Sequence, residues 1–247
     1  MTKTSSPAHR MLSPASLIEL LHSRRFGVEY QPIVQVKSGE AFGYEALARF
    51  YAADGGAVPP QTVFDALESH PLALYQVEHL LKRMQLDEAP SGELFINLDP
   101  DTFHLGASDS GEHALVEMMS ERPNVTVEII ENASFCDAEK SLAMASTFAE
   151  RNVGLALDDI GAPASMLSLP VLLHMDYLKF DRHWWDHWQS PGYRKLLATL
   201  MRFARDHGQS TILEGVETAE QWTEAVALGV DYVQGYFFRE CFHTVHP

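Results

Sequence analysis

The chain has 247 residues and a formal charge of −16 at neutral pH, from 34 acidic and 18 basic side chains, and 46% of its residues are apolar. This length and composition suit one large globular domain and exclude wholesale disorder. The negative charge excludes a broad nucleic-acid-binding surface, because a polyanion would be repelled, so we expect no DNA partner.

The predicted elements begin after a loose Ser/Pro/Thr-rich tail at residues 1–13. Residues 14–25 show helical periodicity, and Ser13 with Pro14 suits a helix cap and first turn. Short runs rich in β-forming residues then recur along the chain. These runs lie at residues 26–36, 41–50, 94–98, 125–130, 153–157, 177–180, 211–213 and 232–234.

Most gaps between these runs carry helical periodicity, for example at residues 72–86, 138–151, 193–207 and 219–228. A short Lys-Ser-Gly-Glu turn separates the first two runs, which predicts an antiparallel hairpin. Every later connection is long enough for a helical crossover between parallel strands. The predicted fold class is therefore α/β, a modified (β/α)8 TIM-like barrel with an antiparallel first strand, built as one domain over residues 14–247.

Polar side chains stand at or just after the end of nearly every predicted strand. In a barrel of parallel strands these ends converge on one mouth, where catalytic residues gather. A single acid in such a place is usually a solvated loop residue or a helix cap, whereas a ring of them needs another explanation. The set is Asn97, Glu128, Asp158, Asp159, Lys179, Asp181, Glu214, Glu217 and Gln234, and Glu45 lies inside the second predicted strand.

Carboxylates crowded at one mouth cannot all stay ionised without compensating charge. Divalent cations would supply that charge, and oxygen-only ligands, including the Asn97 amide, favour hard ions such as Mg²⁺ or Mn²⁺. Adjacent Asp158 and Asp159 suit two ions about 3.5 to 4 Å apart. Such a site is typical of phosphoester hydrolysis, in which Lys179 would orient the nucleophile or neutralise developing charge.

Cysteine usage and hydropathy predict a cytoplasmic protein. Cys136 and Cys241 are the only cysteines, and they lie far apart outside any CxxC pair, which argues against a disulfide scaffold or a thiolate zinc site. No apolar stretch approaches the roughly 18 residues of a membrane span. The start of the chain also lacks the apolar core of a signal peptide, so we expect no membrane partner.

Eight ordered segments, from about residue 30 to residue 238, resemble the EAL-domain family of cyclic di-GMP phosphodiesterases. A three-letter motif alone would be a weak signal, whereas eight segments in order are a strong one. They are Tyr-Gln-Pro-Ile at 30–33, Glu-Ala-Leu at 45–47 followed by Arg49, Phe-Ile-Asn-Leu at 95–98, Glu-Ile-Ile-Glu at 128–131, Asp-Asp-Ile-Gly at 158–161, Tyr-Leu-Lys-Phe-Asp at 177–181, Glu-Gly-Val-Glu at 214–217 and Gln-Gly at 234–235.

The resemblance implies metal-dependent hydrolysis of cyclic di-GMP to linear pGpG in bacterial second-messenger signalling. It implies two metal ions, Mg²⁺ or Mn²⁺, held by Glu45, Asn97, Glu128, Asp158, Asp159 and Glu214. Lys179 and Glu214 would hold or activate the hydrolytic water, and Glu45 and Asp158 would complete the catalytic set. The positions implied to contact or support the nucleotide are Gln31, Arg49, Asp181, Glu217 and Gln234.

The loop after the paired aspartates departs from the family pattern. Family members that turn over substrate carry a Phe-Gly-Thr-Gly-Tyr-Ser-Ser-like stretch there, whereas this chain has Ile-Gly-Ala-Pro-Ala-Ser-Met at 160–166. Pro163 stands where the family has a flexible glycine, and Ala162 stands where the family has the hydroxyl partner of the loop anchor, here Glu131. The departure leaves open a catalytically weak or silent cyclic di-GMP receptor.

Two partner arrangements follow from the resemblance. The family couples dimerisation to activity through this loop, which implies a homodimer. A silent receptor would act through a signalling protein partner. A third alternative, a protein-binding module without nucleotide, conflicts with the metal positions, because such a module has no physical reason to keep mutually repelling acids.

His183 and His187 have the i, i+4 spacing of a metal pair, inside Arg-His-Trp-Trp-Asp-His-Trp. The interleaved Trp184, Trp185 and Trp188 favour a packed or interface helix over a zinc pair. The three tryptophans suit either a subunit contact or a local core.

Overall fold

The computed structural model describes residues 12–107, 113–130, 135–163 and 166–247. Residues 1–11 of the predicted tail lie outside this part. The first helix, α1 (Pro14–His22), is shorter than its predicted range of 14–25. Its start is as predicted, because the Ser13 side chain accepts a hydrogen bond from the Ser16 backbone N–H and Pro14 opens the first turn.

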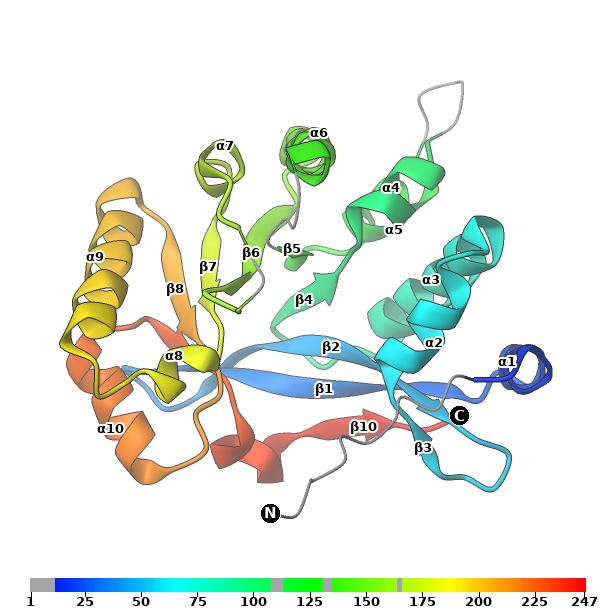
Figure 1. Ribbon diagram of the computed structural model, residues 1–247, viewed down its shortest axis with the longest axis horizontal. Helices are drawn as coiled ribbons and strands as arrows, with labels where there is room; N and C mark the ends of the chain where they lie inside the picture. Colours follow the sequence, from blue (N-terminus) through cyan, green and yellow to red (C-terminus); the bar gives the residue numbers. More distant parts are fainter. Residues whose placement is uncertain (1–11, 108–112, 131–134, 164–165) are drawn as a thin grey trace, which may run out of the picture.

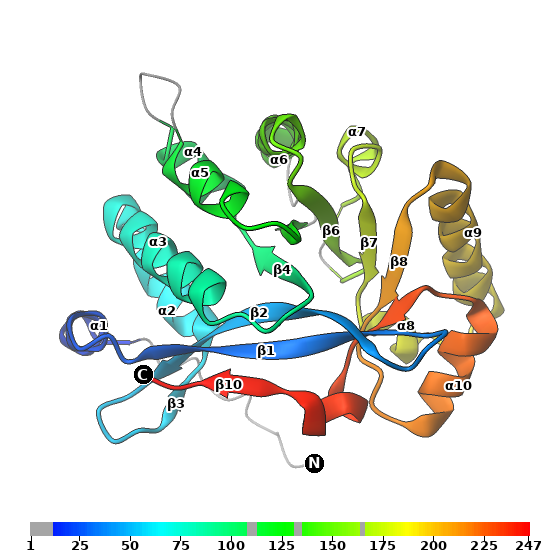
Figure 2. The same ribbon diagram turned by 180° about the vertical axis from the view of Figure 1, so that it is seen from behind.

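Eight strands of the described chain close into a barrel (Figures 1 and 2). Strand β1 pairs antiparallel with both β2 and β9, and the neighbouring pairs from β2 round to β9 are parallel. The predicted modified barrel with an antiparallel first strand is confirmed. Its strands are β1 (Phe26–Gln35), β2 (Ala41–Tyr51), β4 (Glu93–Asn97), β5 (Val125–Ile130), β6 (Gly154–Ile160), β7 (Tyr177–Phe180), β8 (Ser210–Leu213) and β9 (Tyr232–Val233).

Two short strands extend the sheet beyond the barrel. Strand β3 (Ala57–Val58) pairs with the end of β2, and β10 (His243–Val245) pairs antiparallel with the first half of β1. Neither strand was predicted, since two or three residues are too few to show an alternating pattern.

Helices surround the barrel, as both views show (Figures 1 and 2). The longer ones match the predicted periodic segments, and α10 has the predicted bounds. In the described residues no helix has the length and apolar character needed to cross a membrane. The remaining helices are α2 (Pro60–Leu67), α3 (Pro71–Asp87), α4 (Pro100–Leu105), α5 (Ala114–Ser120), α6 (Phe135–Glu150), α7 (Leu169–Leu172), α8 (His183–Asp186), α9 (Pro191–His207), α10 (Ala219–Leu228) and the 3-10 helix η1 (Tyr236–Cys241).

The barrel lumen is filled by apolar and aromatic side chains. Ile33, Phe95, Ala156 and Ile212 form one fully buried cluster, and the Phe95 and Tyr177 ring centroids lie 5.1 Å apart. A second and larger core lies between the strands and the surrounding helices. Because the lumen is packed, side chains just above this cluster stand on an apolar floor at the carboxyl ends of the strands.

Candidate metal centre

Strand alternation brings the predicted polar residues to one end of the barrel. Alternate side chains of a strand point to the same face, so Asn97 follows Phe95 and Asp158 follows Ala156 into the lumen. Because the flanking strands are in register, Asn97 lies opposite Glu128. The same spacing of two residues brings four more side chains to this end of the lumen. They are Glu45, Lys179, Glu214 and Gln234.

Lys179 stands at the centre of this end of the barrel and has no exposed surface. Its Nζ lies 2.6 Å from a Glu128 carboxylate oxygen, 2.9 Å from Glu214 and 3.1 Å from Asp158. The nearest Glu45 oxygen is 3.5 Å away. Burial lowers the pKa of Lys179, but the surrounding carboxylates raise it well above its usual range, so the side chain stays an ammonium ion.

Four carboxyl groups pair with this one ammonium ion, and a fifth, that of Asp159, lies beside two of them. In one group Glu45, Glu128 and Asp158 each offer a carboxylate oxygen within 4.8 Å of the others, and Asp158, Asp159 and Glu214 form a second such group. If all five are ionised, four negative charges remain uncompensated beside Lys179. Two divalent cations would balance that charge, and the all-oxygen donor set fits hard ions such as Mg²⁺ or Mn²⁺.

Asp158 and Asp159 reach the same site through a local distortion of β6. Consecutive side chains of a regular strand point to opposite faces. Here the β6–β7 register shifts between Leu157 and Ile160, and Asp159 adopts a left-handed backbone with φ of 59°. Bulges of this kind redirect side chains beside active sites, and the strain of a left-handed residue other than glycine persists where the surroundings hold it.

Burial and mutual repulsion raise the pKa of several of these carboxyl groups in the absence of a cation. Burial, and then the Glu45 charge, raise the pKa of Glu128 well above its usual range. Burial and the Asp158 charge raise the pKa of Asp159 to about 6. Burial raises the pKa of Glu214 to about 8, against the attraction of Lys179. Binding of cations would therefore displace protons from the cluster.

Glu45 is the exception in this cluster. Burial raises its pKa, but the Lys179 charge and two side-chain amides lower it more, so the net shift is downward. The Asn97 Nδ2 donates to Glu45 Oε1 at 2.9 Å, and the Gln234 Nε2 donates to Oε2 at 2.6 Å. The two amides thus fix the orientation of an ionised carboxylate.

A chain of polar contacts leads from this cluster along β1. Gln234 Nε2 lies 3.5 Å from the Gln31 side-chain oxygen, and Gln31 in turn donates to Glu29 at 3.0 Å. Arg49 Nη2 also pairs with Glu29, at 2.5 Å. The sequence analysis had not selected Glu29, although its spacing of two residues from Gln31 on a strand places both on one face.

Two predicted positions lie outside this cluster. Asp181 is buried beyond the end of β7, where it accepts hydrogen bonds from the backbone and the ring of His183. Glu217 is exposed between β8 and α10, outside both carboxylate groups. Glu131, the predicted loop anchor, lies outside the described residues, as do positions 164 and 165 of the loop.

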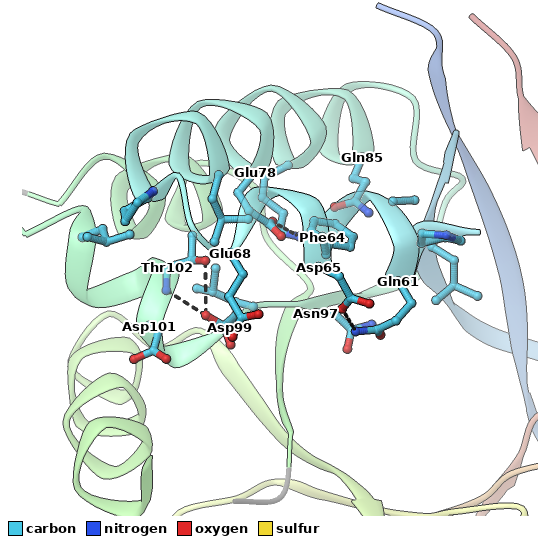
Figure 3. A pocket seen from close by; sticks show the side chains of 18 of the residues that line it. Gln61, Phe64, Asp65, Glu68, Glu78, Gln85, Asn97, Asp99, Asp101 and Thr102 are labelled. Carbon is cyan, nitrogen blue, oxygen red and sulfur yellow. Dashed lines mark hydrogen bonds and ion pairs between the residues drawn. The ribbon is translucent and has the colours of Figure 1, made fainter. Parts of the chain in front are cut away.

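A cavity of about 830 Å³ adjoins the cluster, between β2, α2, α3 and α4. Arg49 and Asn97 belong to its lining, and the Asn97 amide connects it to the cluster through its hydrogen bond to Glu45. Figure 3 shows Glu78 and Gln85 of α3 on one wall and Asp99 and Thr102 of the α4 region opposite them. The sequence analysis missed this wall, because an acid inside a helix gives no local signal that it faces a cavity.

Comparison with known proteins supports the same family. A family described as EAL domain matches residues 12–240 of the chain. The chain is 27% identical over 239 residues to a probable cyclic di-GMP phosphodiesterase, PdeN, of Escherichia coli K12, covering 92% of this chain and 46% of the relative. It is 29% identical to the cyclic di-GMP phosphodiesterase RocR of Pseudomonas aeruginosa, over 92% of this chain and 60% of RocR. The chain thus spans about half the length of several curated relatives.

Solved structures agree with the fold. The MucR phosphodiesterase in complex with cyclic di-GMP superposes with a TM-score of 0.74 at 25% identity, over 90% of this chain and 94% of that structure. The EAL-domain protein YkuI of Bacillus subtilis, in complex with cyclic di-GMP and calcium, gives a TM-score of 0.75 at 23% identity, over 94% of this chain and 58% of YkuI. The second likeness supports the fold alone.

Proposed function

Because the chain belongs to the EAL domain family of cyclic di-GMP phosphodiesterases, we propose that it hydrolyses cyclic di-GMP to linear pGpG with the help of two divalent ions, Mg²⁺ or Mn²⁺. The observation that carries this proposal is the pair of carboxylate groups around the buried Lys179. Relatives named as cyclic di-GMP phosphodiesterases, such as PdeL and RocR, support the substrate.

We assign the two ions to the two carboxylate groups. Glu45, Glu128 and Asp158, with the Asn97 amide oxygen, would hold one ion, and Asp158, Asp159 and Glu214 would hold the other. When bound, such ions lower the pKa of a coordinated water and stabilise charge on phosphoryl oxygens. Asp158 belongs to both groups, which fits a bridging carboxylate.

Glu214 is the best placed base for the hydrolytic water. Its side chain is 18% exposed, whereas that of Glu128 is fully buried, so water can reach Glu214. Burial raises the pKa of Glu214 to about 8 in the metal-free protein, so a bound cation would have to displace this proton before the carboxylate could accept one from water. Lys179, 2.9 Å from Glu214, would orient this carboxylate and neutralise charge that develops on the phosphate.

The cavity beside Arg49 is the proposed seat of the nucleotide. Its volume of about 830 Å³ lies in the range of small-ligand sites. Arg49 would exchange part of its ion pair with Glu29 for a phosphate oxygen. The Glu78 carboxylate in the cavity wall would accept hydrogen bonds from guanine N–H groups. We retain Gln31, Gln234, Asp181 and Glu217 as proposed contacts or supports of the bound nucleotide.

The alternative is a catalytically silent cyclic di-GMP receptor that acts through a protein partner. The sequence of the loop at 160–166 favours it, since Pro163 fixes one φ angle and lacks a backbone N–H. This loop follows Asp159 directly, so a small displacement there would misplace one ion and reduce the rate. The cavity, which lies on the β2 and β4 side, would still bind nucleotide.

The deciding experiment incubates the purified chain with cyclic di-GMP and either Mg²⁺ or Mn²⁺, followed by chromatography for pGpG. We expect product from the wild type and none from Glu45→Ala or Asp158→Ala. Glu117→Gln is the matched control, because this acid is exposed on α5 and lies outside both carboxylate groups and the cavity lining. Binding of cyclic di-GMP without any product would favour the receptor, and equal product from Asp158→Ala would contradict the metal assignment.

A further inference from the structure

Two indole groups connect helix α8 to the strands on either side of β7. Trp184 Nε1 donates to the Ile160 carbonyl oxygen at 2.7 Å, at the end of β6. Trp185 Nε1 donates to the Glu214 carbonyl oxygen at 2.8 Å, just after β8. Ile160 directly follows Asp159, and Glu214 is itself one of the carboxylates. The Trp185 indole therefore holds the backbone of one acid of the second carboxylate group, and the Trp184 indole holds the residue that follows another.

The backbone on both sides lies tightly against α8. A Cβ on Gly161 would come within 2.4 Å of Trp184 Nε1, and a Cβ on Gly215 would come within 2.4 Å of the Arg182 Cβ. Both glycines also have left-handed φ angles, of 92° and 68°. A side chain at either position would push α8 away from the strand ends.

The left-handed conformation of Asp159 needs an external support of this kind. A left-handed backbone at φ of 59° is uncommon for a residue with a Cβ, even for aspartate, and it persists where the surroundings hold it. The Ile160 carbonyl, one residue further on, accepts bonds from both Trp184 Nε1 and the Asp181 backbone N–H. The Asp181 N–H belongs to the end of β7, whereas Trp184 belongs to α8. Helix α8 therefore supplies half of the hydrogen bonds that hold this carbonyl.

We propose that Trp184 and Trp185 are positioning residues that hold Asp159 and Glu214 at the spacing required by the second divalent ion. This inference rests on the proposed function and identifies the part of the chain that aligns its site. The indole N–H groups, rather than the rings, carry the role, because each bond ends on a backbone atom beside a carboxylate.

Trp188 provides a matched control in the same segment. Its ring packs against Trp185 with centroids 4.6 Å apart, and Arg194 lies 5.1 Å above it. Its Nε1 has no hydrogen-bond acceptor within the described residues. Replacement by phenylalanine therefore removes an aromatic N–H from the same cluster without touching either strand end.

The alternative role for Trp184 and Trp185 is core packing alone. Trp184 packs edge-on against Phe180 and Tyr193, with centroid distances of 6.3 Å and 5.9 Å. Phenylalanine keeps most of such ring contacts but cannot donate a hydrogen bond. If packing were the whole role, Trp184→Phe and Trp185→Phe would resemble Trp188→Phe in every property of the metal site.

The experiment measures Mn²⁺ binding to wild type, W184F, W185F and W188F by electron paramagnetic resonance of free Mn²⁺, with thermal melts to confirm folding. We expect two sites in the wild type and in W188F. W184F and W185F should keep the first site but bind the second ion about 10–100-fold more weakly, as is usual when a support of a metal ligand is lost. If W184F does not fold, W185F decides alone.

Turnover supplies a second readout. W184F and W185F should lose about 100-fold in kcat, because a ligand is displaced, while KM changes little since the nucleotide cavity lies near β2 and α3. If the wild type makes pGpG but W184F and W185F bind Mn²⁺ in the same way as W188F, the inference about the tryptophans is wrong. The proposed hydrolysis would still stand. The opposite result is a wild type that makes no pGpG, together with weaker binding of the second Mn²⁺ in W184F and W185F. This result would contradict the proposed hydrolysis but support the inference about the tryptophans.

Discussion

Lys179 is the only cation inside the carboxylate cluster among the described residues, so the metal-free protein depends on it. Removal of one partner from a buried ionic network leaves uncompensated charge and typically costs about 3–5 kcal/mol. We therefore expect Lys179→Met to lose stability on that scale in EDTA. Mn²⁺ should restore more of the free energy of unfolding in this variant than in the wild type, as measured by urea denaturation.

Lys82→Met is the control for this prediction. The Lys82 ammonium is also buried, but its partner is Glu78, 2.7 Å away in the cavity wall. This variant should lose stability without rescue by Mn²⁺. Equal unfolding free energies for wild type and Lys179→Met in EDTA would contradict the central role of Lys179.

Two substitutions at Asp159 separate the effect of its left-handed backbone from the effect of its charge. Asparagine adopts left-handed φ angles more readily than other residues with a Cβ, whereas alanine is strained there by roughly 1–2 kcal/mol. In EDTA, Asp159→Asn should be at least as stable as wild type, because repulsion from Asp158 is removed, and Asp159→Ala should be less stable than Asp159→Asn. Both variants should lose the second Mn²⁺ site, which urea denaturation and Mn²⁺ titration would test.

Alternation along strands explains which residues of this site could be predicted. Asn97, Asp158 and Glu214 each lie two residues beyond a lumen-filling side chain, so a correct strand assignment places them together. The contacts of Trp184 and Trp185 could not be predicted, because they end on backbone atoms of strands distant in sequence. The sequence also gives no sign that Glu217 stays exposed while Glu214 is half-buried.

At the scale of elements, the loop after β6 is the segment that we expect to limit turnover. Its first turn is fixed by a bond from the Ala162 N–H to the Asp159 carbonyl at 3.0 Å, and Pro163 follows. The combined change Ala162→Thr and Pro163→Gly should restore a hydroxyl and backbone freedom. We expect a higher kcat in Mg²⁺ and a nearly constant dissociation constant for cyclic di-GMP.

The wild type serves as the reference for this loop, with rates from pGpG chromatography and affinities from isothermal titration. If wild type already turns over as fast as the double variant, the loop does not limit the rate. A fall in affinity in the double variant would show that the loop acts on binding instead.

Element length decided which helices could be predicted. Helices α3, α9 and α10 contain at least ten residues, enough to show an apolar face, and their predicted ranges agree with the structure within two residues at each end. Helices α7 and α8 contain four residues each, which is barely one turn. Their formation depends on tertiary contacts, such as the indole bonds of α8, that no local pattern encodes.

At the scale of the whole molecule, exposed apolar side chains on α7 and α9 would suit the homodimer that the family resemblance implies. Leu169 is 64% exposed and Leu196 is 51% exposed, on two helices that flank β7 and β8 (Figure 1). We expect a dimer in sedimentation velocity and a monomer for Leu169→Glu/Leu196→Glu. Leu72→Glu is the control, since Leu72 is 81% exposed on α3 and should leave the dimer intact. A monomeric wild type would contradict the prediction.

The raised carboxyl pKa values also make the stability of the whole molecule depend on pH. Burial raises the pKa of Glu214 from 4.5 to about 8 and that of Asp159 from 3.8 to about 6. Between the unfolded and folded values, the folded state holds protons that the unfolded chain has released. Stability of the metal-free protein is therefore greatest at low pH within this window and falls as pH rises through about 6 to 8, by an amount on the order of a few kcal/mol.

Thermal melts in EDTA across this pH window should show a falling Tm, and melts in excess Mn²⁺ should show a smaller fall or a rise. The reason is that Mn²⁺ binds the deprotonated carboxylates, so its stabilising effect grows as the protons leave. Glu214→Gln cannot ionise and should flatten the upper part of the EDTA profile, whereas Glu217→Gln, which removes an exposed acid, should not. A metal-free Tm that does not fall from pH 6 to pH 8 would contradict the raised pKa values of these carboxyl groups, because groups ionised in both the folded and the unfolded state give no pH dependence.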